Sequence, residues 1–182
     1  MDKLSGLECS TIAIFLIIFL IPALASGISP STNKNVTYLT YENSTTGIRI
    51  DYPKDWTPLY GMAFMSPKEN DSDTFREGLV VSRGPHGNES IEKLAADVVK
   101  FYNSSLPNFK LLQLKGQSFQ GNPAQNITYT FNLPGNGTIK VMEFGSTEGD
   151  KIHIFRYAAQ ESKFNSYLPI ISRMMDSFKS IK

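Results

Sequence analysis

Apolar and polar residues alternate along much of the chain, which is the period of a half-buried β-strand. Ile48, Ile50 and Tyr52, for example, alternate with Arg49 and Asp51. Similar alternation, or a high content of β-branched and aromatic residues, predicts further strands over residues 36–41, 61–65, 78–82, 109–114, 125–133, 138–144 and 151–158. Short turns rich in glycine and proline separate the later strands, at 116–121, 134–137 and 145–150. Consecutive strands joined by short turns are typical of an antiparallel meander.

Two segments have the period of an amphipathic helix instead. The first opens at Ser90, repeats apolar residues on one face and ends in the polar stretch 103–107. The second lies near the C-terminus, where apolar residues follow a spacing of three and four: Phe164, Tyr167, Ile171, Met174 and Phe178. Together the elements predict an α+β domain with a mainly antiparallel sheet of six or seven strands, one internal helix and one long C-terminal helix.

The N-terminal region reads as an export signal. An unbroken apolar run extends from Ile12 to Leu20, and Pro22 and then Ala23-Leu24-Ala25 follow it. Small residues spaced in this way are typical of a signal-peptidase site, so we expect cleavage between Ala25 and Ser26. The alternative is an uncleaved N-terminal anchor, although the run is shorter than the roughly 20 residues that a spanning helix needs.

This interpretation divides the chain into a signal peptide over residues 1–25, a flexible tether over 26–35 and a single domain over 36–182. The signal inserts in the membrane during export, and the domain is extracytoplasmic, either secreted or on the outer face of the cytoplasmic membrane. The one cysteine, Cys9, belongs to the leader, so the exported domain has no disulfide and no thiol nucleophile. The net charge of the whole chain is +1, which argues against a general nucleic-acid binder.

Seven Asn-x-Ser/Thr triplets follow the leader, several times the number that chance predicts for this composition. Their asparagines are the predicted glycan acceptors Asn35, Asn43, Asn70, Asn88, Asn103, Asn126 and Asn136. The excess indicates a secreted glycoprotein from a glycosylating lineage, either archaeal or eukaryotic. The alternative is that a surface rich in Ser, Thr and Asn produces such triplets by accident.

Four short patterns resemble the PsbP-like family, whose namesake is an extrinsic subunit of the photosystem II oxygen-evolving complex. A strand runs into Tyr52-Pro53 and is followed by Trp56, and Gly121-Asn122-Pro123-Ala124 precedes a later strand. The other two patterns are a late hairpin ending in Phe155-Arg156-Tyr157-Ala158 and a C-terminal helix closing on Met175-Asp176-Ser177-Phe178. With its simple export signal and its sequons, the chain is most similar to the secreted PsbP-related proteins of archaea.

The resemblance implies an α/β/α sandwich and an accessory, non-catalytic role. Members of the superfamily serve as extrinsic photosystem subunits that help to retain calcium and chloride, as a Ran GTPase-binding protein, and as exported lipoproteins and chaperones. The leader lacks the character of a chloroplast transit peptide, which argues against a photosynthetic role.

The sequence offers little for nucleophilic catalysis. It has no Gly-x-Ser-x-Gly elbow, and His86 and His153 are the only candidate bases. His86 lies in a predicted turn, and His153 lies mid-strand, where an exposed or partly buried structural residue is expected. The histidines also lack the spacing of a catalytic zinc site. We therefore expect a protein that is not an enzyme.

One segment could bind a metal ion. The loop 69–77 is rich in oxygen ligands, and Asp71, Asp73 and Glu77 are the predicted ligands for calcium, which prefers such hard donors. The loop lacks the central glycine and terminal glutamate of an EF-hand, so a solvated polar loop is the alternative interpretation.

Two hypotheses of function follow. The first is a secreted, glycosylated, non-catalytic accessory protein that binds a protein or membrane complex of the cell envelope through one face of its sheet. The second is a module that binds a small ligand or a divalent cation such as calcium, with the loop 69–77 as its site. A hydrolase is a distant third.

Overall fold

The computed structural model describes residues 36–181. Over these residues the chain forms ten strands and two helices, in the order β1 (Tyr38–Asn43), β2 (Ile48–Pro53), β3 (Thr57–Leu59), β4 (Ala63–Met65), β5 (Gly78–Pro85), α2 (Ile91–Ser105), β6 (Lys110–Phe119), β7 (Asn122–Leu133), β8 (Gly137–Glu148), β9 (Lys151–Gln160), α3 (Phe164–Ser177) and β10 (Lys179–Ser180). The predicted leader, the cleavage site at Ala25 and Ser26, the tether and the acceptor Asn35 lie outside the described residues.

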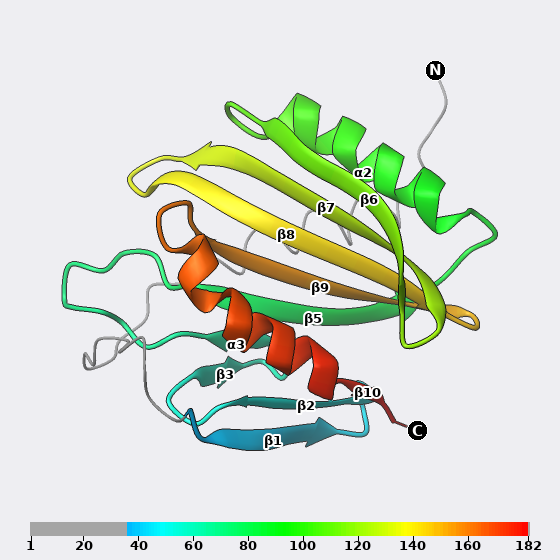
Figure 1. The fold of residues 1–182 in the computed structure, drawn as a ribbon, viewed down its shortest axis with the longest axis horizontal. Helices are drawn as coiled ribbons and strands as arrows, with labels where there is room; N and C mark the ends of the chain where they lie inside the picture. Colours follow the sequence, from blue (N-terminus) through cyan, green and yellow to red (C-terminus); the bar gives the residue numbers. More distant parts are fainter. Residues whose placement is uncertain (1–35, 182) are drawn as a thin grey trace.

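The strands form two antiparallel sheets. The larger has seven strands in the order β3-β4-β5-β9-β8-β7-β6, and the smaller has three in the order β1-β2-β10 (Figure 1). The prediction of an α+β fold with two helices is therefore confirmed. The larger sheet is the predicted antiparallel sheet of six or seven strands. The first two strands lie outside it, because they pair with each other and with the short β10.

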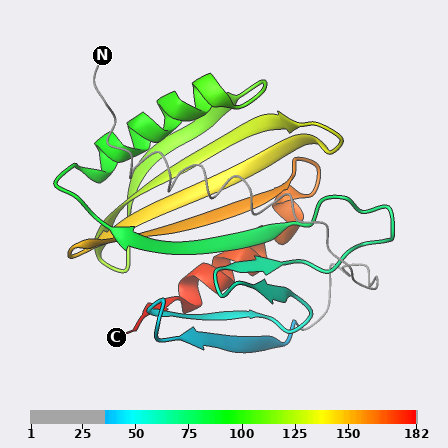
Figure 2. The same ribbon diagram turned by 180° about the vertical axis from the view of Figure 1, so that it is seen from behind.

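The two helices cover opposite faces of the large sheet. Helix α3 lies in front of this sheet in Figure 1 and behind it in Figure 2. Alternate residues of β8 reflect this arrangement: Val141 belongs to the core beneath α2, whereas Phe144 belongs to the core beneath α3. This alternation is the strand period that the sequence displays.

Each face buries its own apolar core. The α3 core joins the large sheet, the small sheet and α3, and its buried members include Ile48, Ile50, Trp56, Leu79, Phe144, Phe155, Tyr157, Tyr167, Ile171, Met174 and Phe178. The α2 core is smaller and includes Phe75, Ala95, Tyr102, Leu106, Ile127, Tyr129, Ile139 and Val141. Residues from both ends of the described chain thus meet in the α3 core.

The start of α2 agrees with the sequence pattern, whereas two strands are longer than predicted. Ser90 caps α2, since its hydroxyl accepts a hydrogen bond from the backbone N–H of Lys93 at 3.2 Å. Strands β6 and β8 run longer than expected, because Gly116 and Gly145 lie inside them and not in turns. A Cβ at Gly145 would lie 3.5 Å from Cδ1 of Ile91, an ordinary contact distance, so the first residue of α2 packs directly over this glycine.

Within residues 36–181, neither helix combines the length and the apolar character needed to cross a bilayer.

Candidate functional site

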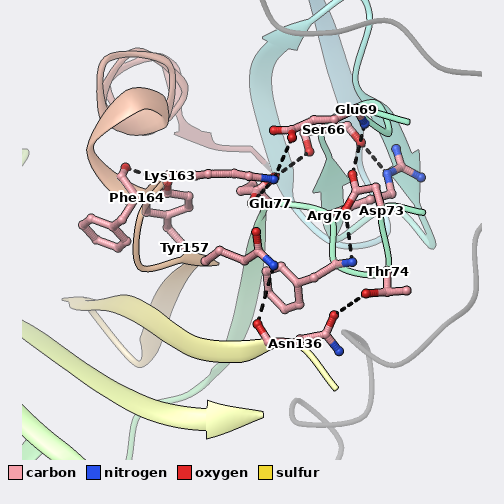
Figure 3. Close-up of polar contacts among 12 residues, drawn as sticks. Ser66, Glu69, Asp73, Thr74, Arg76, Glu77, Asn136, Tyr157, Lys163 and Phe164 are labelled. Atoms are coloured by element: carbon pink, nitrogen blue, oxygen red, sulfur yellow. Dashed lines mark hydrogen bonds and ion pairs between the residues drawn. The ribbon is translucent and has the colours of Figure 1, made fainter. Parts of the chain in front are cut away.

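The loop that contains the predicted metal ligands connects β4 to β5 and is closed at its base. The backbone N–H of Ser66 donates to the carbonyl oxygen of Glu77 at 2.8 Å, directly beyond the last β4–β5 pair, Met65 and Gly78. The Ser66 hydroxyl also lies 3.5 Å from Oε2 of Glu77. We call residues 66–77 the β4–β5 loop; Figure 3 shows its polar contacts.

A lysine from a distant part of the chain joins this loop to the start of α3. The Lys163 ammonium lies 2.9 Å from Oε2 of Glu69 and 3.8 Å from Oε1 of Glu77 (Figure 3). The Glu77 side chain is fully buried, whereas those of Glu69 and Lys163 are about one-quarter exposed (26% and 25%). Lys163 therefore bridges a carboxylate near the surface and a carboxyl group in the interior.

Burial and charge act on these groups in opposite directions. Burial raises the pKa of Glu77, a backbone hydrogen bond and the Lys163 charge oppose that rise, and Asp73 and Glu69 add to it. For Lys163, burial lowers the pKa, but the hydrogen bond to Glu69 and the surrounding carboxylates outweigh burial and raise it. Burial therefore disfavours the ionised form of Glu77, whereas the neighbouring carboxylates favour the charged form of Lys163.

Two buried tyrosines border Glu77 from the side of β9 and α3. The Tyr157 hydroxyl donates to the carbonyl oxygen of Phe164 at 2.8 Å, which ties β9 to the first turn of α3. Burial raises the pKa of both Tyr157 and Tyr167, and the negative charge of Glu77 adds to the rise. Both phenols therefore stay protonated at neutral pH.

Arg76 fastens the β4–β5 loop to the adjacent strands. Its guanidinium donates to the carbonyl oxygen of Ser66, to that of Met65 at 3.1 Å and to the Thr57 hydroxyl at 3.1 Å. The residue is only 8% exposed, and burial lowers its pKa. The loop is thus anchored at its base by a cation that binds backbone oxygens.

The predicted calcium ligands do not converge. Both carboxylate oxygens of Asp73 accept backbone hydrogen bonds within the loop, from Glu69 at 3.0 Å and from Phe75 at 3.2 Å. Asp71 is exposed in the turn, and Glu77 lies beneath the loop beside Lys163. Across residues 36–181, no three His, Cys, Asp or Glu side chains are placed to hold a metal ion. The calcium site remains a prediction of the sequence, and this geometry adds no support to it.

A second buried ionic cluster lies beneath α2. Nε of Arg156 is 2.7 Å from Oε2 of Glu143, and the Tyr102 hydroxyl donates to the same oxygen at 2.9 Å. A second guanidinium nitrogen of Arg156 donates to the Tyr102 hydroxyl at 2.8 Å. The three side chains satisfy one another in the interior, so we assign this cluster to the packing of α2 on the sheet.

His153 is more buried than the sequence predicts, with 3% of its surface exposed. The Phe178 ring packs against it at a centroid distance of 5.1 Å, and Nε2 lies 2.9 Å from a carboxylate oxygen of Glu148. Burial lowers the pKa of His153, against the effect of Glu148. The end of α3, which the strand pattern around His153 cannot reveal, is what covers the ring.

The six described sequons differ in their accessibility. Asn70, Asn88 and Asn103 are exposed, and Asn43, Asn126 and Asn136 are partly buried. The amide of Asn43 also donates to the Tyr41 hydroxyl at 2.9 Å, and the amide oxygen of Asn136 accepts from Thr74 at 2.7 Å. Whether any of them bears a glycan stays a prediction.

The long edge strand β6 is the most open part of the sheet. Among the described residues β6 pairs only with β7, and nine of its ten residues are exposed (Figure 1). They include Leu111, Leu112 and Leu114, with exposed fractions of 39%, 43% and 44%. The edge strand at the other end of the sheet, β3, has three residues and contains Pro58, which cannot donate a backbone hydrogen bond. A long exposed edge strand without proline is a typical site for pairing with another chain.

Sequence reasoning missed both Lys163 and the open edge. Lys163 stands far from the acidic loop in the sequence, and no local pattern links it to Glu77. The exposure of Leu111 and Leu114 was equally hidden, because alternating leucines in a strand normally predict burial.

No protein-family model matches the sequence, and no curated protein matches it. Solved structures do share its fold. The solution structure of cyanobacterial PsbP (CyanoP) from Synechocystis superposes with a TM-score of 0.58 at 16% identity, covering 84% of this chain and 97% of that one. This chain has the PsbP fold.

Two further solved structures have the PsbP-like arrangement of this chain. LpqN of Mycobacterium tuberculosis, described as involved in cell envelope biogenesis, matches with a TM-score of 0.57 at 10% identity and covers 80% of this chain and 91% of its own. A Pseudomonas aeruginosa protein of unknown function, described as a proposed regulator, matches with a TM-score of 0.56 at 15% identity and covers 77% and 94%. At these identities the likeness establishes the fold alone.

Proposed function

We propose that this protein is an extracytoplasmic, non-catalytic accessory protein that acts by contacting another protein of the cell envelope. The predicted leader and the excess of sequons support export and glycosylation. The cell-envelope role that is described for LpqN, on the same fold, is in keeping with this location.

The open edge of β6 is the observation that carries the proposal. An exposed ten-residue edge strand with three exposed leucines is an aggregation liability in a monomer, and a binding partner would cover both the leucines and the open backbone edge. The sequence alone suggests contact through one face of the sheet. Because each face of the large sheet bears a helix, we expect the contact at the sheet edge instead.

Crosslinking in the native cell tests this function. A photoreactive residue replaces Leu114 in one variant and the exposed Lys54, which directly follows β2 of the small sheet, in a matched control. We expect one recurrent, stoichiometric envelope protein crosslinked to position 114 and not to position 54. A mature monomer without crosslinked protein at position 114, or equal capture at both positions, would overturn the proposal. Mass spectrometry of the same material reads the N-terminus and the glycans.

A further inference from the structure

The two sides of β6 differ in chemistry. Leu111 lies opposite Tyr129 of β7, and Leu114 lies opposite Ile127. Residues directly opposite each other in a sheet share a face, and both β7 partners belong to the α2 core. The two leucines therefore lie on the same face as that core but remain exposed, because the sheet ends at β6.

The other side of β6 is basic. Lys110 lies opposite Thr130, and Lys115 lies opposite Asn126. Lys110 and Lys115 are an odd number of residues apart, so a regular strand would place them on opposite faces. The register shift between Leu111 and Gln113 adds one residue and brings both lysines to the α3 side.

A third lysine extends this basic strip. Thr130 pairs in turn with Lys140 of β8, so Lys110, Thr130 and Lys140 form one row across three strands. Lys140 lies 4.6 Å from the centroid of the Phe164 ring, at the border with α3. No carboxylate occupies the β6 and β7 positions on this side; they hold Lys110, Gln113, Lys115, Gln117, Phe119, Asn122, Ala124, Asn126, Thr128, Thr130 and Asn132.

We propose that β6 binds an extended segment of a partner protein as an eighth strand, and that this segment alternates apolar and acidic residues. Its apolar side chains would cover Leu111 and Leu114, and its carboxylates would lie beside Lys110 and Lys115. The added backbone would satisfy the unpaired side of β6. This inference rests on the proposed function and specifies the mode of contact and the chemistry of the partner.

Charge favours this occupant over a second copy of the chain. Two β6 strands paired antiparallel in one continuous sheet would place Lys110 and Lys115 of both copies on the same face, where like charges destabilise the pair. The predicted tether, residues 26–35, contains Lys34 and no Asp or Glu. An acidic segment of another protein complements the charge of Lys110 and Lys115, whereas a second β6 strand or the predicted tether would bring further positive charge to them.

Designed peptides test the inference on the folded domain with its natural tether. The first probe is a ten-residue peptide of alternating Val and Glu, the second alternates Val and Lys, and a third is the Val-Glu peptide with a central proline. Fluorescence anisotropy gives the affinities, and hydrogen exchange reads the protection of the β6 amides. The variant Lys110→Glu/Lys115→Glu is compared with the matched control Lys54→Glu/Lys179→Glu, whose exposed lysines follow β2 and lie in β10 of the small sheet.

We expect the Val-Glu probe alone to bind and to protect the amides of β6. Reversal of both β6 lysines should weaken this binding about tenfold and favour the Val-Lys probe, because each cross-strand charge pair changes sign. The control variant should bind like the parent.

Four results would overturn the inference. They are equal binding of both charged probes, equal binding of the proline probe, a parent domain that is dimeric in light scattering through β6, and binding of anionic vesicles without protection of β6 by any peptide. If the envelope protein still crosslinks to position 114 in any of these cases, the accessory function stands and only the strand-addition mode fails.

Discussion

Arg156 and Glu143 form a buried ion pair beneath α2, with a distance of 2.7 Å between Nε and Oε2 and at most one-tenth of either side chain exposed. The two residues lie on neighbouring strands in direct register. A charge in this position depends on its partner, because water cannot replace the interaction.

Replacement of Arg156 by Met should therefore destabilise the domain strongly. We expect a loss of about 3–5 kcal/mol in the free energy of unfolding, since Glu143 keeps its burial and loses its cation. The double variant Arg156→Met/Glu143→Leu should recover part of this loss, as judged by urea denaturation, because the buried Tyr102 hydroxyl still loses the two partners that it has in the parent. Equal losses in the single and double variants would show that packing, and not charge, dominates the site.

Replacement of Glu77 by Gln should change how stability depends on pH. Burial raises the pKa of Glu77 in the folded state, so its contribution is fully present below the unfolded pKa and is lost as pH rises through the folded pKa. The Gln variant lacks this titration, so we expect its stability relative to the parent to increase from pH 4 to pH 8. The exposed Glu161→Gln variant is the control. A Gln variant that loses stability relative to the parent over this range would mean that the attraction of Lys163 outweighs burial.

Replacement of Lys163 by Met should change the pH dependence of stability in the opposite sense to Glu77→Gln: relative to the parent, the variant should lose stability as pH rises. The substitution leaves Glu77 without its nearby ammonium group, and we expect a loss of about 2 kcal/mol at pH 8. The loss should shrink at pH 4, where Glu77 takes up a proton and needs no counter-charge. Denaturant titrations at both values, with Lys54→Met as control, measure the difference. A loss independent of pH would assign the effect to packing of the lysine stem.

Substitutions of Asp71 and Asp73 in the β4–β5 loop distinguish a structural role of these residues from metal binding. Asp73→Asn should cost about 1 kcal/mol, because one of its two acceptors for backbone N–H groups is lost. Asp71→Asn should change stability by less than about 0.5 kcal/mol, since Asp71 is exposed. We expect the Tm of the parent domain to be equal in calcium and magnesium. A calcium-specific rise in Tm that Asp71→Asn abolishes would instead support the predicted metal site.

Glycan occupancy should follow accessibility in the folded domain. We expect glycans at Asn70, Asn88 and Asn103, and little at Asn43, whose amide nitrogen is already hydrogen-bonded to Tyr41. Glycopeptide mass spectrometry of the native protein measures each site. High occupancy at Asn43 would indicate that glycans are added before the β1–β2 hairpin forms.

The sequence predicts those elements whose signal is local. Ser90 marks the start of α2 because a hydroxyl before an apolar repeat satisfies the first helical N–H groups, and the spacing that ends at Phe178 marks α3. The split into two sheets is not local. It depends on β2 pairing with β1 and β10 and not with a strand of the large sheet. The two residues of β10, Lys179 and Ser180, are too few to show a period.

The candidate sites show the same division. An oxygen-rich loop is visible in the sequence, but Lys163, which lies beside the buried carboxyl group of Glu77, is far from this loop along the chain. The register shift at Leu112 is likewise invisible, although it decides on which face Lys110 and Lys115 lie. Long-range pairing, and not residue type, determines these features.

The pairing of β2 with β10 also sets the order of events during biosynthesis. Arg49 and Ile48 find their partners in Lys179 and Ser180, at the far end of the described chain. The α3 core, which contains Ile48, Ile50 and Phe178, therefore cannot close while the C-terminal residues are still being synthesised. A chain of this topology stays incompletely folded until its last helix has emerged, which is the state that an unfolded-protein export channel accepts.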